Sequence, residues 1–366
     1  KAGTVTINGR HTFLNMMVAE GGIVSHSGAT TTQEFRHHLV VTEKLSVAFD
    51  GKISADGKGY LGGHRNSNNS DRGMTLGNVA EGSTPYAGGS HGGYGGKRDS
   101  GQSSGKLYGS LYEPLDLGAG GGGNGVGGSG GGAVRLEAEE LVLDGVLSAD
   151  GQTPSESSGG AGGSLWVKVG LLKGSGSLQA NGGNGNCFNG GGFGGGGGRV
   201  ALYYREASGF DLSRITAYGG NSPCNNAGEV YRNGGAGTVY LKGLDQKGVV
   251  RFDNNGLVSS WGTQLLSPLP GKVTALGTDW IEDSQASWAP GSLVGASVKL
   301  GGHLFRILSN TAVRLTLECS GLDLTTLVAV GDSYSFDFSG EFSLVGGDYL
   351  FQGELSLPSL SLKNSG

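Results

Sequence analysis

The stretch Leu147-Ser148-Ala149-Asp150-Gly151 has three counterparts in this chain: ISADG at 53–57, LQANG at 178–182 and ITAYG at 215–219. Their shared alanines, at positions 55, 149, 180 and 217, lie 94, 31 and 37 residues apart. Spacings of roughly 20–50 residues are typical of stacked structural repeats rather than of one globular core. A glycine-rich run lies close to each copy, so the phrase and the run form one repeating unit.

Short alternating segments complete the unit. Residues 133–138, 164–169, 199–204 and 238–242 alternate with the period of two that is expected for β-strands, and nothing keeps a period of 3.6. One unit cannot bury its apolar side alone, whereas stacked units share an elongated core. The sequence therefore predicts an all-β fold: a right-handed parallel β-solenoid with glycine-rich loop layers and a more regular β region at the C-terminal end.

Glycine is the dominant residue type. The chain of 366 residues has 77 glycines, of which 57 lie in residues 51–250 and 15 in residues 251–366. Each ordered glycine costs roughly 0.5–1 kcal/mol more than alanine in lost backbone freedom. The runs are either flexible linkers or extended, polyproline-II-like segments that exchange backbone hydrogen bonds. We favour ordered segments, because the runs recur in phase with the strands.

The change in composition near residue 250 divides the chain. We expect N-terminal β-strand rungs at 1–57 and a glycine-rich repeat block at 58–250. A tryptophan-containing β region at 251–366 follows, either sandwich-like or continuing the repeats. The chain starts at Lys1 without a signal-like stretch, and apolar alternation continues almost to its last residue. These features predict a mature product or a fragment of a longer protein.

The net charge and the hydropathy of the chain argue against nucleic acid and the membrane interior as partners. The formal net charge is -5 and only 16% of residues are charged. This balance argues against nucleic acid as a partner, because nucleic-acid-binding proteins carry basic patches. No run approaches the ~20 apolar residues that a membrane-spanning helix needs, so we expect no membrane insertion.

Two cysteines occupy matching positions. Cys187 and Cys224 each lie five residues after the first glycine of a repeat phrase. Equivalent positions on adjacent rungs would be roughly 4.8 Å apart, and disulfides need Cα separations of about 4.4–6.8 Å. We predict a Cys187–Cys224 disulfide and hence an oxidising setting, extracellular or at the cell surface. The alternative is two free thiols in loops.

Candidate chemistry is sparse. No histidine pairs with a cysteine or carboxylate at zinc-like spacing. The loop at 66–73 is rich in oxygen ligands, as calcium prefers, but a turn that satisfies its own backbone is the favoured interpretation. The carboxylate pairs Glu139-Glu140 and Glu282-Asp283 are surface acids by default, since a glycosidase needs two carboxyls roughly 5–10 Å apart across a cleft. We predict no catalytic, cofactor or metal residues, with calcium as a minor alternative.

Aromatic side chains concentrate in or beside the glycine runs. Such rings can stack on sugars or anchor a protein contact, or they can simply cap the loop layer. The candidate contact residues are Tyr86, Tyr94, Tyr108, Tyr112, Phe188 and Phe193.

Longer phrases carry a family resemblance over roughly residues 40–310. They are DGKISADGKGY at 50–60, YGSLYEPLDLGAGGGG at 108–123, GGGAVRLEAEELVLDGVLSADG at 130–151, GGGGGRVALYY at 194–204 and GGAGTVYLKG at 234–243. With them the chain resembles a modular family of glycine-rich extracellular proteins of bacteria, adhesin-like β-solenoids with plant and protist relatives. The resemblance implies a large secreted or surface-displayed protein, adhesive or structural, with no agreed catalytic residues.

These features predict a non-enzymatic extracellular module, structural or adhesive, in a surface fibre or a large repeat protein. Its expected partners are copies of itself or neighbouring repeat modules, with surface glycans as further candidates. One alternative is a polysaccharide lyase or hydrolase built on a β-helix. Another is a phage-type tail adhesin that binds surface glycans.

Overall fold

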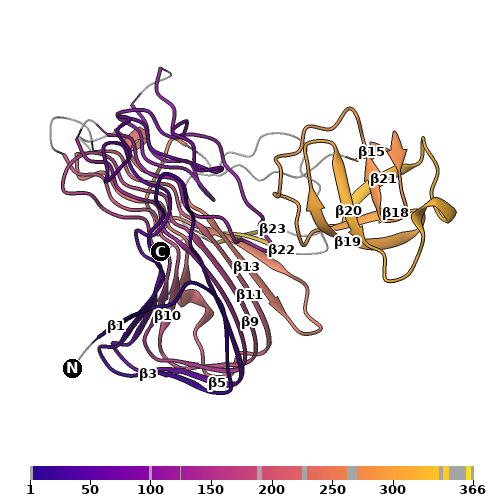
Figure 1. Cartoon of the computed structure of the whole chain (residues 1–366), viewed down its shortest axis with the longest axis horizontal. Helices are drawn as coiled ribbons and strands as arrows, with labels where there is room; N and C mark the ends of the chain where they lie inside the picture. The colour runs from indigo at the N-terminus through magenta and orange to yellow at the C-terminus, as the bar shows by residue number, and fades with distance from the viewer. Residues whose placement is uncertain are drawn as a thin grey trace.

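The computed structural model describes residues 3–98, 101–123, 125–187, 192–224, 229–261, 270–337 and 341–345, together with the backbone of 360–363. Strands arranged in three sheets make up most of the regular structure (Figure 1). Short 3-10 turns lie between some of them: η2 (Leu212–Arg214), η3 (Val230–Arg232) and η4 (Leu324–Thr326).

The first sheet has six short strands, and every neighbouring pair is parallel. In spatial order they are β1 (Thr4–Thr6), β4 (Ile23–Ser25), β6 (Lys52–Ser54), β8 (Val146–Ser148), β10 (Ser177–Gln179) and β12 (Ile215–Thr216). The repeat phrases supply the last four of these strands. Ile53, Leu147, Leu178 and Ile215 are in register on adjacent strands, as the repeat predicts.

The second sheet has ten strands and faces the first. Its order is β2 (Gly9–Phe13), β5 (His37–Val47), β7 (Ala133–Leu143), β9 (Ser164–Lys173), β11 (Arg199–Glu206), β13 (Thr238–Gly243), β14 (Val249–Asp253), β22 (Glu341–Val345) and β23 (Leu360–Lys363). The tenth strand, β3 (Met16–Val18), also pairs with β5. From β2 to β13 all neighbours are parallel.

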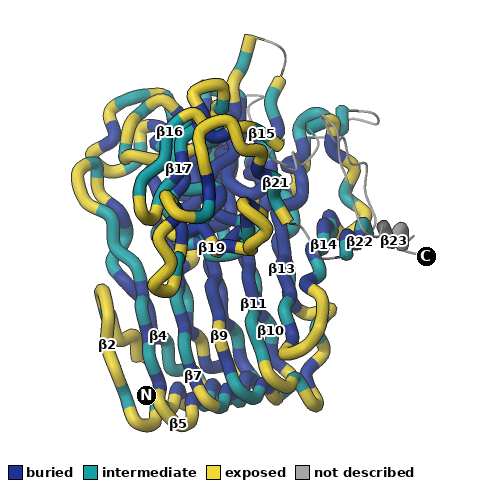
Figure 2. Tube along the Cα trace, turned by 90° about the vertical axis from the view of Figure 1, so that its right-hand side faces the viewer, coloured by how far each residue is buried: buried dark blue, intermediate teal, exposed yellow. Residues whose placement is uncertain are grey.

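The main core lies between these two sheets. In the second sheet Leu39, Leu136, Val167, Leu202 and Leu241 are in register, and all are buried. They join the phrase residues of the first sheet in one apolar cluster. In Figure 2 the middle strands of the body carry the buried residues, whereas β2 at the N-terminal edge is largely exposed. Each leucine buried in this way contributes about 1.5–3 kcal/mol.

Glycine-rich segments pack directly on one another beyond the strands. The amide of Gly131 donates to Ala161 O at 2.8 Å, that of Gly162 to Gly196 O at 2.9 Å, and that of Gly197 to Gly235 O at 2.9 Å. Segments far apart in the chain join this layer, since Gly196 N donates to Gly89 O at 2.9 Å. The prediction of ordered segments that exchange backbone hydrogen bonds is confirmed for these residues.

The layer has no room for side chains at many positions. A Cβ on Gly196 would lie 1.9 Å from Gly93 O, and one on Gly131 would lie 2.0 Å from Ala149 O. Neither glycine has a left-handed φ. Close approach of neighbouring backbones, rather than an unusual dihedral angle, therefore requires glycine here.

The fourth residue of the phrase forms a hydrogen-bond ladder along the first sheet. Asp56 Oδ1 accepts the amide of Asp150 at 2.8 Å, Asp150 Oδ1 accepts that of Asn181 at 2.6 Å, and Asn181 Oδ1 accepts that of Tyr218 at 2.8 Å. Each side chain thus satisfies a backbone donor one rung along, which pins the register of four rungs.

The third sheet has seven strands and stands to one side of the body (orange in Figure 1). Its order is β15 (Gly271–Lys272), β21 (Ser333–Asp337), β18 (Ser297–Leu300), β19 (His303–Asn310), β20 (Arg314–Glu318), β17 (Trp280–Glu282) and β16 (Ala275–Leu276). All of its neighbouring pairs are antiparallel. A separate apolar cluster, with Val298 and Leu315 at its centre, fills it.

The prediction of a right-handed parallel β-solenoid is therefore wrong. Only the first sheet is wholly parallel: in the second sheet β13 pairs antiparallel with β14, and the third sheet is wholly antiparallel. The physical reason is the length of the connections, because parallel neighbours need a long crossover whereas antiparallel neighbours need only a tight turn. Only five residues separate β13 from β14, and Gly301-Gly302, with φ of +56° and +80°, join β18 to β19 as in a type I′ hairpin.

The three predicted segments of the chain contribute to common sheets. Strands β5 and β7 pair across residue 57, and β14 crosses residue 250. Strand β22 then returns to pair parallel with β14. The division at 57 and 250 stays a prediction about folding units.

A methyl group in the glycine layer should strongly destabilise the protein. In Gly196→Ala the new Cβ meets the backbone of Gly93, which cannot move without breaking its own hydrogen bonds. We expect a loss of about 3 kcal/mol or more in the free energy of unfolding, the upper range for overpacking. Gly28→Ala is the control, because the nearest atom to its Cβ is 3.8 Å away. Equal denaturation midpoints for the two variants would contradict the packed layer.

The Asp56–Asp150 pair should make stability depend on pH. Burial and the charge of Asp56 raise the pKa of Asp150 to about 7 from 3.8. The folded state then binds more protons than the unfolded state between these values, so stability falls as pH rises through this window. Asp150→Asn keeps the acceptor for Asn181, and we expect it to gain about 1–2 kcal/mol at pH 8 relative to the parent chain. Denaturant unfolding of both chains at pH 4 and pH 8 measures this, and an equal fall in stability between the two pH values for parent and variant would contradict the prediction.

Candidate functional site

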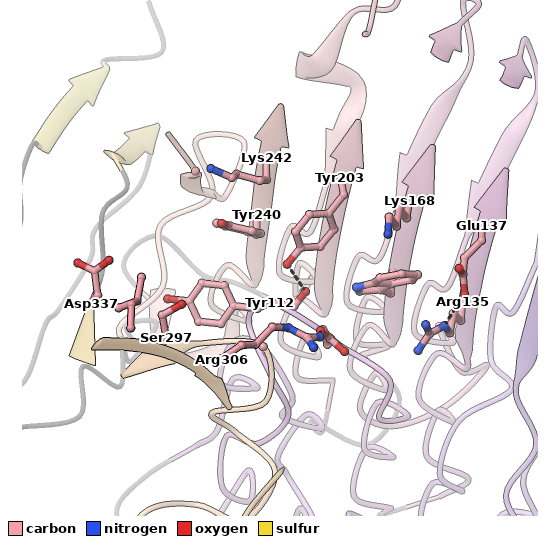
Figure 3. A pocket seen from close by; sticks show the side chains of 15 residues that line it. Tyr112, Arg135, Glu137, Lys168, Tyr203, Tyr240, Lys242, Ser297, Arg306 and Asp337 are labelled. Carbon is pink, nitrogen blue, oxygen red and sulfur yellow. Dashed lines mark hydrogen bonds and ion pairs between the residues drawn. The ribbon is translucent and has the colours of Figure 1, made fainter. Parts of the chain in front are cut away.

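The outward face of the second sheet presents two rows of side chains. Strand alternation points Leu165, Val167 and their neighbours into the core, so the intervening residues face away from it. Two rows cross the strands in register. The aromatic row is Arg135, Trp166, Ala201 and Tyr240, and the charged row is Glu137, Lys168, Tyr203 and Lys242. Figure 3 shows the charged row, with Arg135 and Tyr240 of the aromatic row, on adjacent strands.

The aromatic row is largely covered. Trp166 and Tyr240 are only 6% and 8% exposed and pack with Leu111, Tyr112 and Leu115. The Tyr112 and Tyr240 ring centroids lie 5.1 Å apart, and the Arg135 guanidinium lies 4.3 Å from the Trp166 ring centroid. This row anchors the segment at 110–115 against the sheet.

The third sheet is tied to the same segment. Ser110 Oγ donates to Val294 O at 2.6 Å, and Arg306 forms an ion pair with Glu113. Tyr112 packs against both the aromatic row and the apolar cluster of the third sheet. These contacts bring Ser297, Arg306 and Asp337 of the third sheet opposite the second sheet (Figure 3).

A groove of about 490 Å³ lies between these walls. A second hollow of about 590 Å³ continues along the outward face of the sheet toward Val40, Arg205 and Asp245. All four residues of the charged row line both hollows. The two hollows therefore form one extended groove with the charged row at its middle.

Most acidic groups of the groove already have cationic partners. Glu137 Oε1 is 3.1 Å from Arg135 Nε and 3.2 Å from His38 Nε2. Burial alone would raise the pKa of Glu137, but the hydrogen bonds from Arg135 and His38 outweigh it and lower that pKa. Glu113 pairs with Arg306, and Glu139 pairs with Arg205. Arg135 and His38 thus hold the Glu137 carboxylate ionised.

The tyrosines of the groove are neutral hydrogen-bonding groups. Burial, followed by the neighbouring phenols, raises the pKa of Tyr203 well above its ordinary value, and burial raises the pKa of Tyr240 to about 12. The Tyr203 hydroxyl donates to Tyr112 O at 2.9 Å. This bond holds the ring of Tyr203, which is only partly buried, in the middle of the groove.

Of the aromatic residues predicted as contacts, Tyr112 lines the groove. Tyr108 and Phe193 are buried, at 4% and 0% exposed, so they act in packing. Tyr86 and Tyr94 are part-exposed and lie away from the residues that line the groove. Phe188 lies outside the described residues.

Reasoning from the sequence missed Trp166, Tyr203 and Tyr240. Their signal was present in the alternation of the strands: each occupies an outward position between core residues. In a stacked sheet such positions form rows, and aromatic or charged residues that recur there would identify a groove.

The predicted disulfide is confirmed. Cys187 and Cys224 are bonded, with Cα atoms 5.4 Å apart.

The loop at 66–73 is held by hydrogen bonds of Asn68. Its Nδ2 donates to Gly62 O and Arg72 O, both at 2.9 Å, and its Oδ1 accepts the amide of Ser70 at 3.1 Å. Among the described residues no three His, Cys, Asp or Glu side chains gather as metal ligands would.

Comparison of the chain with protein-family models, curated proteins and solved structures finds no match. The resemblance to glycine-rich surface proteins thus stays a prediction. Within the described part of the chain, no helix combines the length and the apolar character needed to cross a membrane. The disulfide is compatible with an oxidising compartment.

Breaking the disulfide should destabilise the fold. The bond joins residues 37 positions apart, and in the chain-entropy model a closure of this size contributes about 2–4 kcal/mol. We expect the Cys187→Ser, Cys224→Ser double variant to unfold at lower denaturant concentration by that amount. Cys319→Ser, at the free cysteine, is the control. A double variant as stable as the control would contradict a structural role for the bond.

Proposed function

We propose that this chain is an extracellular adhesive module that binds carbohydrate in the groove and does not catalyse a reaction. The observation that carries the proposal is the part-exposed ring of Tyr203 between Lys168 and Lys242, in the row that both hollows share. An aromatic face with hydrogen-bonding groups beside it suits a sugar ring, which has apolar C–H faces and polar edges.

The rigidity of the scaffold supports this role. The charged row stands on adjacent strands, so its spacing is set by the backbone ladder rather than by loops. A site on such elements loses little conformational entropy when it binds a ligand. The glycine layer stiffens the same body, which suits a module that transmits force between a surface and a neighbouring module or a second copy of the chain.

The chemistry of the groove favours binding over cleavage. Hydrolysis of a glycosidic bond needs a protonated carboxyl as general acid, whereas Glu113 and Glu137 are paired with arginines. A tyrosine acting as a base would need a lowered pKa, whereas those of Tyr112, Tyr203 and Tyr240 are raised. We therefore place the lyase or hydrolase alternative second.

Binding to immobilised polysaccharides tests the proposal. We expect Tyr203→Leu, which removes the ring, to weaken binding about tenfold, as the loss of an aromatic contact worth roughly 1.5 kcal/mol would. Tyr203→Phe keeps the ring and should bind nearly as well as the parent chain. Phe49→Leu is the control, since Phe49 is 74% exposed and lies outside the groove.

Three outcomes would overturn the proposal. The first is that Tyr203→Leu, still folded by circular dichroism, binds every polysaccharide as the parent chain does. The second is that no polysaccharide binds at all. The third is the release of new reducing or unsaturated ends from a polysaccharide by the parent chain and not by Tyr203→Leu, which would favour the enzyme alternative.

A further inference from the structure

We infer that the groove selects anionic linear polysaccharides, with an acidic sugar stacked on Tyr203 and its negative group held by Lys168 or Lys242. This inference rests on the proposed function and adds the ligand class. The chain as a whole is acidic, at -5, so a local positive site is not a consequence of overall composition.

The first argument is the distribution of unpaired charge. The arginines around the groove have carboxylate partners: Arg135 has Glu137, Arg205 has Glu139 and Arg306 has Glu113. Lys168 is exposed and makes no ion pair with a described residue. Lys242 donates to the backbone oxygen of Gln246, and it forms no ion pair with a carboxylate of the described residues. The uncompensated positive charge therefore lies at the middle of the groove.

The second argument is the placement of these lysines around the ring. Lys168, Tyr203 and Lys242 are direct cross-strand neighbours on β9, β11 and β13. Neighbouring strands are about 4.8 Å apart, so the two lysine backbones are separated by roughly 10 Å with the ring between them. A sugar on Tyr203 has an ammonium group within reach on either side, whichever way the polymer chain runs.

The third argument is the shape of the groove. The charged row lines two adjoining hollows, of about 490 and 590 Å³, rather than one closed pocket. A single monosaccharide would occupy only part of this space, whereas a linear polymer can pass from one hollow into the other. The shape thus favours an internal stretch of a polysaccharide over a terminal sugar.

The remaining acids lie toward the ends of the groove. Asp337 stands on the opposite wall, on β21, and Asp245 lies in the turn after β13. Neither carboxylate forms an ion pair with a described residue. They can accept hydroxyl hydrogen bonds from sugars on each side of the acidic one. A ligand with negative charge at every position would be repelled there, so a spaced distribution of charge fits best.

The test compares one polymer with and without its charge. Binding of the full chain to four linear polymers is measured by biolayer interferometry at low and high salt: a polysaccharide with one uronic acid in each oligosaccharide repeat, its carboxyl-reduced derivative, a sparsely sulfated glucan and the unsulfated glucan. We expect the charged member of at least one pair to bind at least tenfold more tightly than its neutral counterpart. We also expect that preference to weaken in salt, because exposed charges are screened. The two pairs distinguish carboxylate from sulfate recognition.

Substitutions assign the selectivity to the two lysines. We expect Lys168→Gln and Lys242→Gln each to lower the affinity for the charged polymer about fivefold, and the double variant about twentyfold. Affinity for the neutral polymer should change less than twofold. Lys52→Gln is the control and should bind as the parent chain does, because Lys52 is an exposed strand residue of the first sheet.

The outcomes separate this inference from the proposed function. If neutral and charged polymers bind equally, and Tyr203→Leu weakens both, carbohydrate binding holds and anionic selectivity is wrong. If the Lys168→Gln, Lys242→Gln variant keeps the parent preference for charge, the assigned site is wrong. If no polymer binds, the proposed function itself fails.

Discussion

The structure depends on hydrogen bonds between bare backbones. In the glycine layer, amides and carbonyls of segments far apart in the chain meet directly, as in Gly196 to Gly89 and Gly93 to Gly197. Such contact is possible only where no side chain separates the backbones. Because buried peptide groups must be paired, these hydrogen bonds hold the layer together, alongside a small apolar cluster of its own that contains Tyr60 and Leu117. These hydrogen bonds offset the conformational entropy that so many glycines lose on folding.

The strands complement this layer. The first and second sheets enclose the apolar core, and the layer closes the body beyond their ends. The outward face of the second sheet is therefore not needed to cover the core. Its aromatic row packs against the segment at 110–115 and holds it in place. The charged row can therefore carry residues chosen for chemistry rather than for stability. Tyr112 and Glu113 connect it with the third sheet, so two sheets of different architecture share one groove.

The repeat phrase was enough to predict the disulfide and the register of four strands of the first sheet, β6, β8, β10 and β12. Equivalent residues such as Leu147 and Leu178 stack directly, and the same equivalence places Cys187 beside Cys224. The antiparallel third sheet was not predictable from the repeat, because its strands follow local turns such as Gly301-Gly302 instead. The groove was missed for a related reason. Its residues come from different rungs and from the third sheet, and only the folded register shows that Lys168, Tyr203 and Lys242 form a row.

The side-chain ladder of Asp56, Asp150 and Asn181 has an evolutionary consequence. It aligns each rung with the next through local contacts, so alignment is independent of how much polypeptide lies between rungs. Strands β6 and β8 are direct neighbours in the first sheet, and so are β8 and β10. The chain between β6 and β8 includes residues 58–132 and is much longer than the chain between β8 and β10. Additional residues can thus be inserted into such a connection while the strands on either side keep their pairing. The architecture can acquire new surface segments, including the one that lines the groove, by insertion rather than by redesign.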